Sequence, residues 1–294
     1  MKKNIPILVI TLLVVILIIM SFTVFAGNHK QSVTIEEKVS DEIKYLNNYI
    51  ISLLGHFNGL TVGDAIFQTS QPKTQLGKQE ANPQNEEEKK KSSSNKDEGD
   101  TNEEKTNIAR NGIFGNKGNF DPNWEIIEVR IEQLYQTWNT ISIDLHGLSI
   151  PGNDILSFGD GLNAVTQSIK KKDKAKAMEE LARIHSLLPK YQESYLQKNE
   201  KTEILNVEVE VVNSYVMVTE DKWTEAAEML DKAENHFANI LNSVSVQAEK
   251  KNNQTTLNQC YILVNEMRNA VNLKDKDIFY IQYHNFITKI GVII

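Results

Sequence analysis

The sequence predicts an all-α protein in which antiparallel helical hairpins form a bundle. Two observations predict this fold class. Apolar residues in the C-terminal part, residues 122–294, recur at alternating spacings of three and four, which is the pattern of a helix buried along one face. Short aspartate-containing turns also separate these helical stretches. An N-terminal membrane helix and a disordered linker are predicted in addition.

The first element is a run of 22 mostly apolar, uncharged residues, Ile5–Ala26. A helix of that length rises about 33 Å, enough to cross a hydrocarbon core of about 30 Å. Lys2 and Lys3 precede the run, so we expect a signal-anchor with a cytoplasmic stub at residues 1–4 and the C-terminal domain outside the cell membrane. The alternative is a cleaved secretory signal and a secreted protein, because Val24-Phe25-Ala26 fits the small-residue cleavage pattern.

An amphipathic helix is predicted over residues 33–62. Its apolar stripe, again with spacings of four and three, is Val39, Ile43, Leu46, Ile50, Leu53, Phe57 and Leu60. A helix with such a stripe must bury it against something. It either docks on the C-terminal helices as an eighth member, forms the coiled-coil seam of a homodimer through residues 39–60, or lies in the membrane interface.

Residues 68–121 have the composition of a disordered linker. The stretch is polar and of mixed charge, so it cannot bury enough apolar surface to offset the entropy of ordering. Near its end, Gly112–Gly118 is rich in glycine and contains a lysine, but it lacks the Gly-Lys-Ser/Thr ending of a phosphate-binding loop and follows no strand. We therefore interpret it as a flexible end of the linker.

Seven helices are predicted in residues 122–294. Their approximate ranges are 124–148, 154–171, 174–188, 201–219, 222–244, 255–272 and 276–290. Asp121 is expected to cap the first, with Pro122 at its first position, and Asp154 to cap the second. The fourth contains Val207–Val211, which alternates like a strand. A lone strand among helices would have no partner, so a helix is predicted there as well.

A loose repeat joins three pairs of these helices. The triplets Lys172-Asp173-Lys174, Glu220-Asp221-Lys222 and Lys274-Asp275-Lys276 are spaced by 48 and 54 residues, and each aspartate is predicted to cap the helix that follows. This arrangement resembles a short tetratricopeptide-like array, most of all over Asp221–Leu230. The 34-residue period and the signature of that family are absent, so the resemblance concerns architecture alone.

The sequence predicts no catalytic, cofactor-binding or metal-binding residue. It has no His-Glu-x-x-His motif, and no histidine lies three residues after a glutamate as di-iron bundles require. His185 lies in an apolar seam and is interpreted as a core residue. Cys260, the single cysteine, is also expected in the core and cannot form an intramolecular disulfide.

The aromatic residues of the seams are expected in the core too; they are Trp138, Trp223, Tyr283 and Phe286. A ligand slot lined by them is the alternative. Gly159 and Gly161 either permit a close helix approach or loosen their helix.

Charge and composition point to a binding protein of a bacterial cell envelope. Residues 122–294 carry 18 basic and 24 acidic residues, so a nucleic-acid partner is not expected. The Lys-, Asn- and Ile-rich composition is typical of a low-GC bacterium. The predicted function is a membrane-anchored, extracytoplasmic, non-enzymatic scaffold for a protein partner. A helical bundle that binds a small ligand or peptide is one alternative, and a cell-wall hydrolase without a recognisable motif is another.

Overall fold

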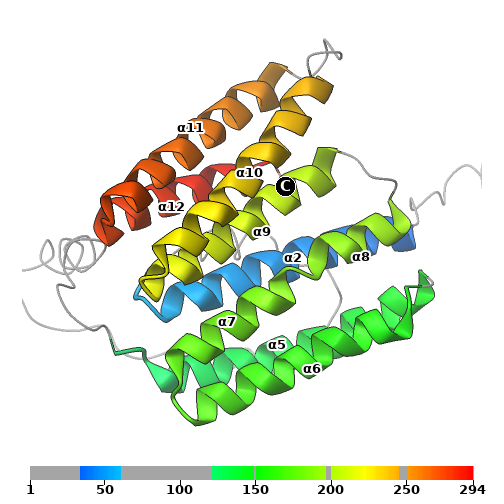
Figure 1. Ribbon diagram of the computed structural model, residues 1–294. Helices are drawn as coiled ribbons and strands as arrows, with labels where there is room; N and C mark the ends of the chain where they lie inside the picture. Colours follow the sequence, from blue (N-terminus) through cyan, green and yellow to red (C-terminus); the bar gives the residue numbers. More distant parts are fainter. Residues whose placement is uncertain (1–33, 61–120, 149, 197–199, 245–250, 294) are drawn as a thin grey trace, which may run out of the picture.

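The computed structural model describes residues 34–60, 121–148, 150–196, 200–244 and 251–293, and these ranges form helices in a bundle-like packing, with no strand among them (Figure 1). This confirms the predicted all-α class. The helices are α2 (Ile35–His56), α5 (Trp124–Gly147), α6 (Gly152–Lys170), α7 (Lys174–His185), α8 (Leu188–Tyr195), α9 (Glu200–Thr219), α10 (Trp223–Val244), α11 (Lys251–Leu273) and α12 (Lys276–Ile290).

Several sequence predictions lie outside the described residues. These are the membrane helix at residues 5–26, most of the linker at residues 68–121 and the glycine-rich Gly112–Gly118. Within the described ranges, every helix is too short or too polar to cross a bilayer.

Helix α2 runs through the middle of the molecule, with α5, α6 and α7 on one side and the α9–α12 group on the other (Figure 1). It packs against α5, α7 and α8, and its whole apolar stripe is buried. Its second half is buried nearly all round, from Leu46 to Gly55. Helix α2 therefore docks on the C-terminal helices, which was the first of the three alternatives for its apolar stripe. A homodimer through residues 39–60 stays a prediction.

Helix α9 explains the strand-like alternation in its sequence. Val207, Val209 and Val211 are buried, and so is Glu208, which lies between two of them. The helix contacts α7, α8, α10 and α12, so it is covered on several sides at once. A helix enclosed in this way needs no polar face, and its apolar residues lose the spacing of three and four.

Two predicted helix caps are wrong. Helix α5 is capped by Asn123, whose side-chain oxygen accepts a hydrogen bond from the N–H of Ile126 at 3.2 Å, so Asp121 and Pro122 precede the cap. Helix α6 begins at Gly152 without a side-chain cap, and Asp154 lies in its first turn. There the carboxylate still faces the positive end of the helix and pairs with Lys190 at 2.6 Å.

The three hairpins α6/α7, α9/α10 and α11/α12 share one turn geometry. Each turn has a residue in the left-handed region, with φ of 54° at Lys172, 60° at Asp221 and 55° at Lys274. The next N–H donates to the carbonyl five residues back, which is the Schellman pattern; these bonds are Asp173 to Ser168 (2.9 Å), Lys222 to Met217 (2.9 Å) and Asp275 to Ala270 (3.0 Å).

The predicted register of the repeat is therefore wrong at one of its three triplets. Asp173 and Asp275 do cap α7 and α12 through their side chains. Asp221, however, occupies the left-handed position that Lys172 and Lys274 hold in the other two turns. The aspartate of the middle turn therefore lies one position earlier than the aspartates of the other two turns.

Gly161 permits a close approach of α6 and α7. A Cβ at this position would collide with the side chain of Ile184 on α7 and would lie 2.9 Å from the guanidinium of Arg183. A Cβ at Gly159 would meet only the indole nitrogen of Trp138, at an ordinary 3.8 Å. Of the two glycines, Gly161 is the one that the helix packing requires.

Candidate functional site

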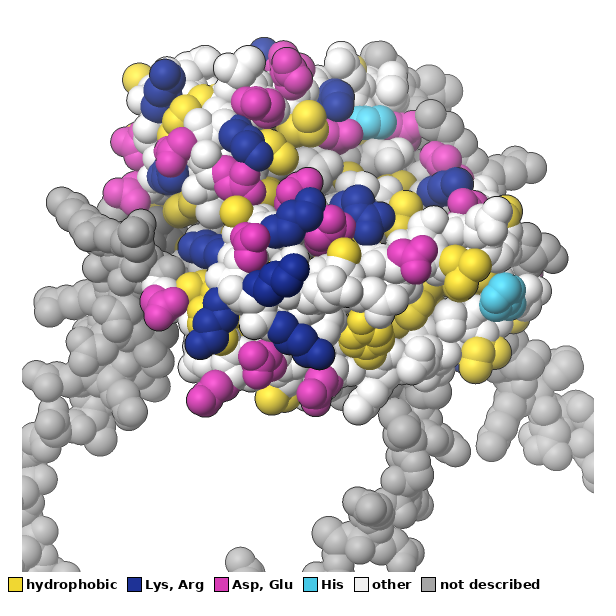
Figure 2. All heavy atoms as spheres, turned by 60° about the horizontal axis from the view of Figure 1, so that its bottom comes forward, with side chains coloured by type: hydrophobic (Ala, Val, Ile, Leu, Met, Phe, Trp, Pro, Cys, Tyr) yellow, Lys and Arg dark blue, Asp and Glu magenta, His cyan; other side chains and the backbone are white. Residues whose placement is uncertain are grey.

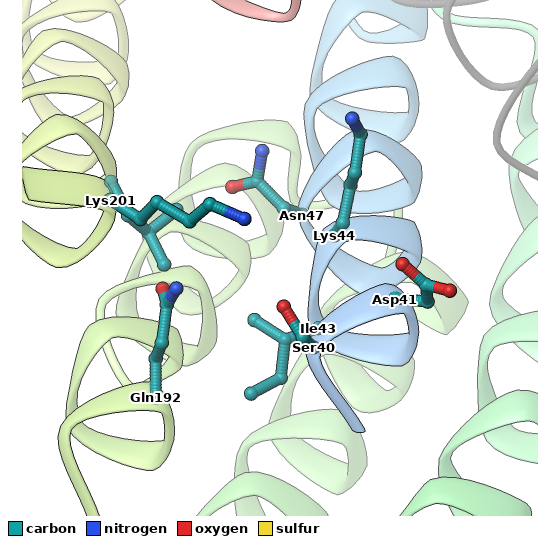
Figure 3. Close-up of a pocket in the computed structure, with 8 residues that line it drawn as sticks. Ser40, Asp41, Ile43, Lys44, Asn47, Gln192 and Lys201 are labelled. Carbon is teal, nitrogen blue, oxygen red and sulfur yellow. The ribbon is translucent and has the colours of Figure 1, made fainter. Parts of the chain in front are cut away.

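A polar cavity of about 220 Å³ opens between α2, α8 and α9 (Figure 3). The first half of α2 supplies most of its wall, α8 supplies one residue and the first turns of α9 supply two. The lining residues are Ser40, Asp41, Ile43, Lys44, Asn47, Gln192, Lys201 and Leu205. Because α2 is held at the centre of the fold, the position of this wall is fixed by the core.

The side chains of α8 and α9 converge on α2 across this space. In Figure 3, Lys201 extends from α9 toward Asn47, and the amide of Gln192 lies below it on the same side. Gln192 is only 7% exposed, and its side chain forms part of the cavity wall. Asp41 points to the opposite side of α2 from Lys201 (Figure 3).

Asn47 joins the cavity to a buried hydrogen-bonded chain. Its amide nitrogen donates to Oε2 of Glu208 on α9 at 2.7 Å, and its amide oxygen lies 2.6 Å from Nε2 of His185 on α7. Because that oxygen can only accept, Nε2 of His185 carries the proton and donates. All three residues are buried, so the chain fixes α2 between two helices that the sequence places about 140 and 160 residues away.

Burial determines the protonation of Glu208 and His185 in this hydrogen-bonded network. It raises the pKa of Glu208 to about 7, against smaller opposing effects of the Asn47 hydrogen bond and the charge of Lys44. Burial also lowers the pKa of His185 to about 3, so the imidazole is neutral at physiological pH. Oε1 of Glu208 and Nδ1 of His185 have no hydrogen-bond partner among the described residues. Because His185 is neutral, Glu208 and His185 are linked through hydrogen bonds to Asn47 and do not form an ion pair.

The geometry of the cavity suits binding rather than catalysis by His185. The imidazole is completely enclosed and its protonated nitrogen is engaged by Asn47, so it does not reach the cavity. The polar side chains that line it are those of Ser40, Asp41, Lys44, Asn47, Gln192 and Lys201. Such groups orient a polar ligand, and Asn47 is held in place behind them.

A second polar cluster joins α2 to α5. The ammonium of Lys38 lies 2.6 Å from Oδ2 of Asp144 and 3.7 Å from Oε1 of Glu42. Burial and the neighbouring Asp144 raise the pKa of Glu42 to about 7, which Lys38 partly opposes. This cluster is a structural link, because its three groups are occupied with one another.

The residues that the sequence assigned to the core are found there. Cys260 is buried, and burial raises the pKa of its thiol to about 12. Trp138 stacks on Phe158 with ring centroids 4.0 Å apart, and Tyr283 stacks on Tyr215 at 4.3 Å. These rings fill the space in which an aromatic ligand slot was the alternative. Phe286 is buried as well, whereas Trp223 packs at the edge of the core.

The sequence predicts neither a metal site nor the residues of the cavity. No three of the histidine, cysteine and acidic side chains in the described ranges are grouped to hold a metal ion. The cavity residues were missed, although Asn47 and Asn48 inside the apolar stretch of α2 are a usable signal of buried polar contacts.

Comparison of the chain with protein-family models, curated proteins and solved structures found no match in any of the three.

Proposed function

We propose that this chain is a non-enzymatic binding and scaffold protein, anchored in a bacterial cell membrane with its helical domain on the outer side. The position of α2 supports the proposal most directly. Only eight residues separate Ala26 from Ile35, the first residue of α2, and eight residues span at most about 29 Å. Since α2 is buried at the centre of the domain, an anchor at residues 5–26 would hold the whole bundle at the membrane.

The surface supports a protein partner rather than a polyanion. Positive and negative side chains are interspersed on the face shown in Figure 2, with small groups of hydrophobic side chains between them. On α5, Ile126 and Val129 are 44% and 55% exposed and line a shallow groove together with Arg130 and Gln133. Helical hairpins that stack as in a tetratricopeptide array offer grooves of this kind to peptides and proteins.

Site-specific photo-crosslinking in intact cells tests this proposal. A photoreactive amino acid at Val129 is expected to capture a discrete protein partner in the membrane fraction, identified by mass spectrometry. The matched control carries the same group at Thr140, an exposed polar position on the same helix. If both positions give the same adducts, or neither gives one, this groove is not a partner surface. Recovery of the chain in the medium would refute the membrane anchor.

A second candidate function is favoured by the cavity. Its convergent polar groups suit a helical bundle that binds a small ligand. At about 220 Å³ the cavity is smaller than the usual range for drug-sized ligands, so a small polar group fits it better than a whole peptide.

A further inference from the structure

Two lysines, Lys44 and Lys201, line the cavity between α2, α8 and α9. Neither Lys44 nor Lys201 has a carboxylate within salt-bridge distance among the described residues. By contrast, Lys38, Lys190 and Lys276 all pair with an acidic residue on another helix or turn. Lys201 is therefore available to a ligand, whereas the charge of Lys44 also acts on the buried Glu208, whose pKa it lowers.

We propose that this cavity is a binding site for an anionic group, a carboxylate or a phosphate. Lys201 and Lys44 supply the opposite charge, and the Gln192 amide and the Ser40 hydroxyl supply hydrogen-bond donors. The site is independent of the protein-partner surface on α5, which lies on a different element and shares no lining residue with it.

The Gln192 amide is a hydrogen-bond donor in the wall of the cavity. Its N–H can donate to an anion there, in place of solvent. Gln192 is only 7% exposed, and in Figure 3 it points from α8 into the space below Lys201. Asn47 cannot serve the ligand in the same way, because His185 and Glu208 already occupy its amide.

The remaining lining fits a small anion with a short apolar stem. Asp41 is the acidic residue of the lining, and its carboxylate lies on the opposite side of α2 from Lys201 (Figure 3). Ile43 and Leu205 add an apolar wall beside the polar groups. A volume of about 220 Å³ holds a carboxylate or phosphate together with a few carbon atoms, but not a long chain.

Two sources can supply this chemistry. The cavity lies along the first half of α2, near the point where the chain leaves the predicted membrane segment, so a lipid phosphate is within reach if the proposed anchor holds. A soluble carboxylate or phosphate compound is the other source. The recognising groups on the protein are the same in both cases, and only the experiment separates them.

The test uses the full chain in nanodiscs and follows the side-chain amide signal of Gln192 by NMR, assigned with Gln192→Leu. In discs of neutral phosphatidylcholine, inorganic phosphate or acetate is added at constant ionic strength. In a second arm, phosphatidylglycerol replaces part of the lipid and no anion is added. We expect a saturable shift with a dissociation constant of about 1 mM, which two charge-assisted contacts can supply.

Variants identify the site. Lys201→Gln is expected to weaken binding about tenfold and Lys44→Gln less, because Lys201 extends furthest into the cavity. The control Lys170→Gln removes an exposed lysine of α6 and should leave the dissociation constant unchanged. A shift in neutral discs identifies a soluble ligand, and a shift confined to phosphatidylglycerol discs identifies a lipid headgroup.

Two results would overturn the inference. One is the absence of a saturable shift in both arms. The other is an equal loss of binding in Lys170→Gln and Lys201→Gln, which would reveal general attraction to lysines. Either result leaves the crosslinking test of the protein partner unaffected, so the two proposals can fail separately.

Discussion

Replacing Glu208 by glutamine measures what a buried carboxylate costs this fold at neutral pH. Burial raises the pKa of Glu208 from 4.5 to about 7. Between these two values the folded chain keeps a proton that the unfolded chain has released. The stabilisation from that proton is fully present below pH 4.5 and is lost as the pH rises through 7. A difference of about 2.5 pKa units corresponds to a loss on the order of 3 kcal/mol.

Glutamine keeps an oxygen that accepts the hydrogen bond from Asn47, but it cannot ionise. The free energy of unfolding of Glu208→Gln, relative to the unmodified chain, should therefore rise by roughly 2.5 kcal/mol between about pH 5 and about pH 8. Urea unfolding in neutral detergent, followed by far-UV circular dichroism, measures this difference. His185 acts in the opposite direction, since its lowered pKa makes stability rise from pH 3 to 6.5, but both proteins contain it.

The control for this prediction is Glu193→Gln, an exposed carboxylate on α8. Its substitution should change stability by less than about 0.5 kcal/mol at either pH. A Glu208→Gln difference that is constant with pH, or that falls as pH rises, would refute the reasoning. It would mean that Glu208 is already ionised at low pH and that a nearby cation, with Lys44 the closest candidate, offsets its burial.

Three further predictions concern the packing of the fold; the first two are measured by urea unfolding and the third by calorimetry. Gly161→Ala should lose about 1–3 kcal/mol because its methyl group collides with α7, whereas the control Gly159→Ala should be neutral or gain up to about 1 kcal/mol; equal effects would contradict the close-packing argument. Asp173→Ala should lose about 1 kcal/mol with the α7 cap, and Lys172→Gly should gain up to about 1 kcal/mol by relieving its positive φ. Segments 31–66 and 122–294, expressed separately, should associate with a micromolar dissociation constant in titration calorimetry. Leu46→Ala should weaken this association at least tenfold, and the absence of association would refute the docking of α2.

Much of the fold could be predicted because its helices are amphipathic. The stripe from Val39 to Leu60 and the seam from Ile127 to Leu145 are buried as their spacing indicates. The sequence could not show which helix lies at the centre. Asn47 and Glu208 are too far apart in the chain for any periodic pattern to connect them, and their pairing depends on tertiary packing.

The errors at the caps have a local cause. Asp121, Asn123 and Asp154 all carry oxygen atoms that can accept from a helix N-terminus, so the residue type fixes a cap only to within a few positions. At Asp221 the same ambiguity arises, because aspartate is tolerated in the left-handed region as well as at caps. The cavity was missed for another reason: lysine, glutamine and serine on helix surfaces look alike until three helices bring them together.

The central position of α2 also constrains how the chain can mature. An N-terminus that remains inside the membrane delivers α2 first, yet its partners α7, α8 and α9 follow only after about 120 further residues. Until α9 has emerged, α2 has only part of its native packing, chiefly that against α5, and Asn47 lacks its partner Glu208. Closing so long a loop is not itself a large obstacle, since doubling its length costs only about 0.6 kcal/mol. Insertions between α2 and α5 should therefore be far better tolerated than a change in the order of the helices.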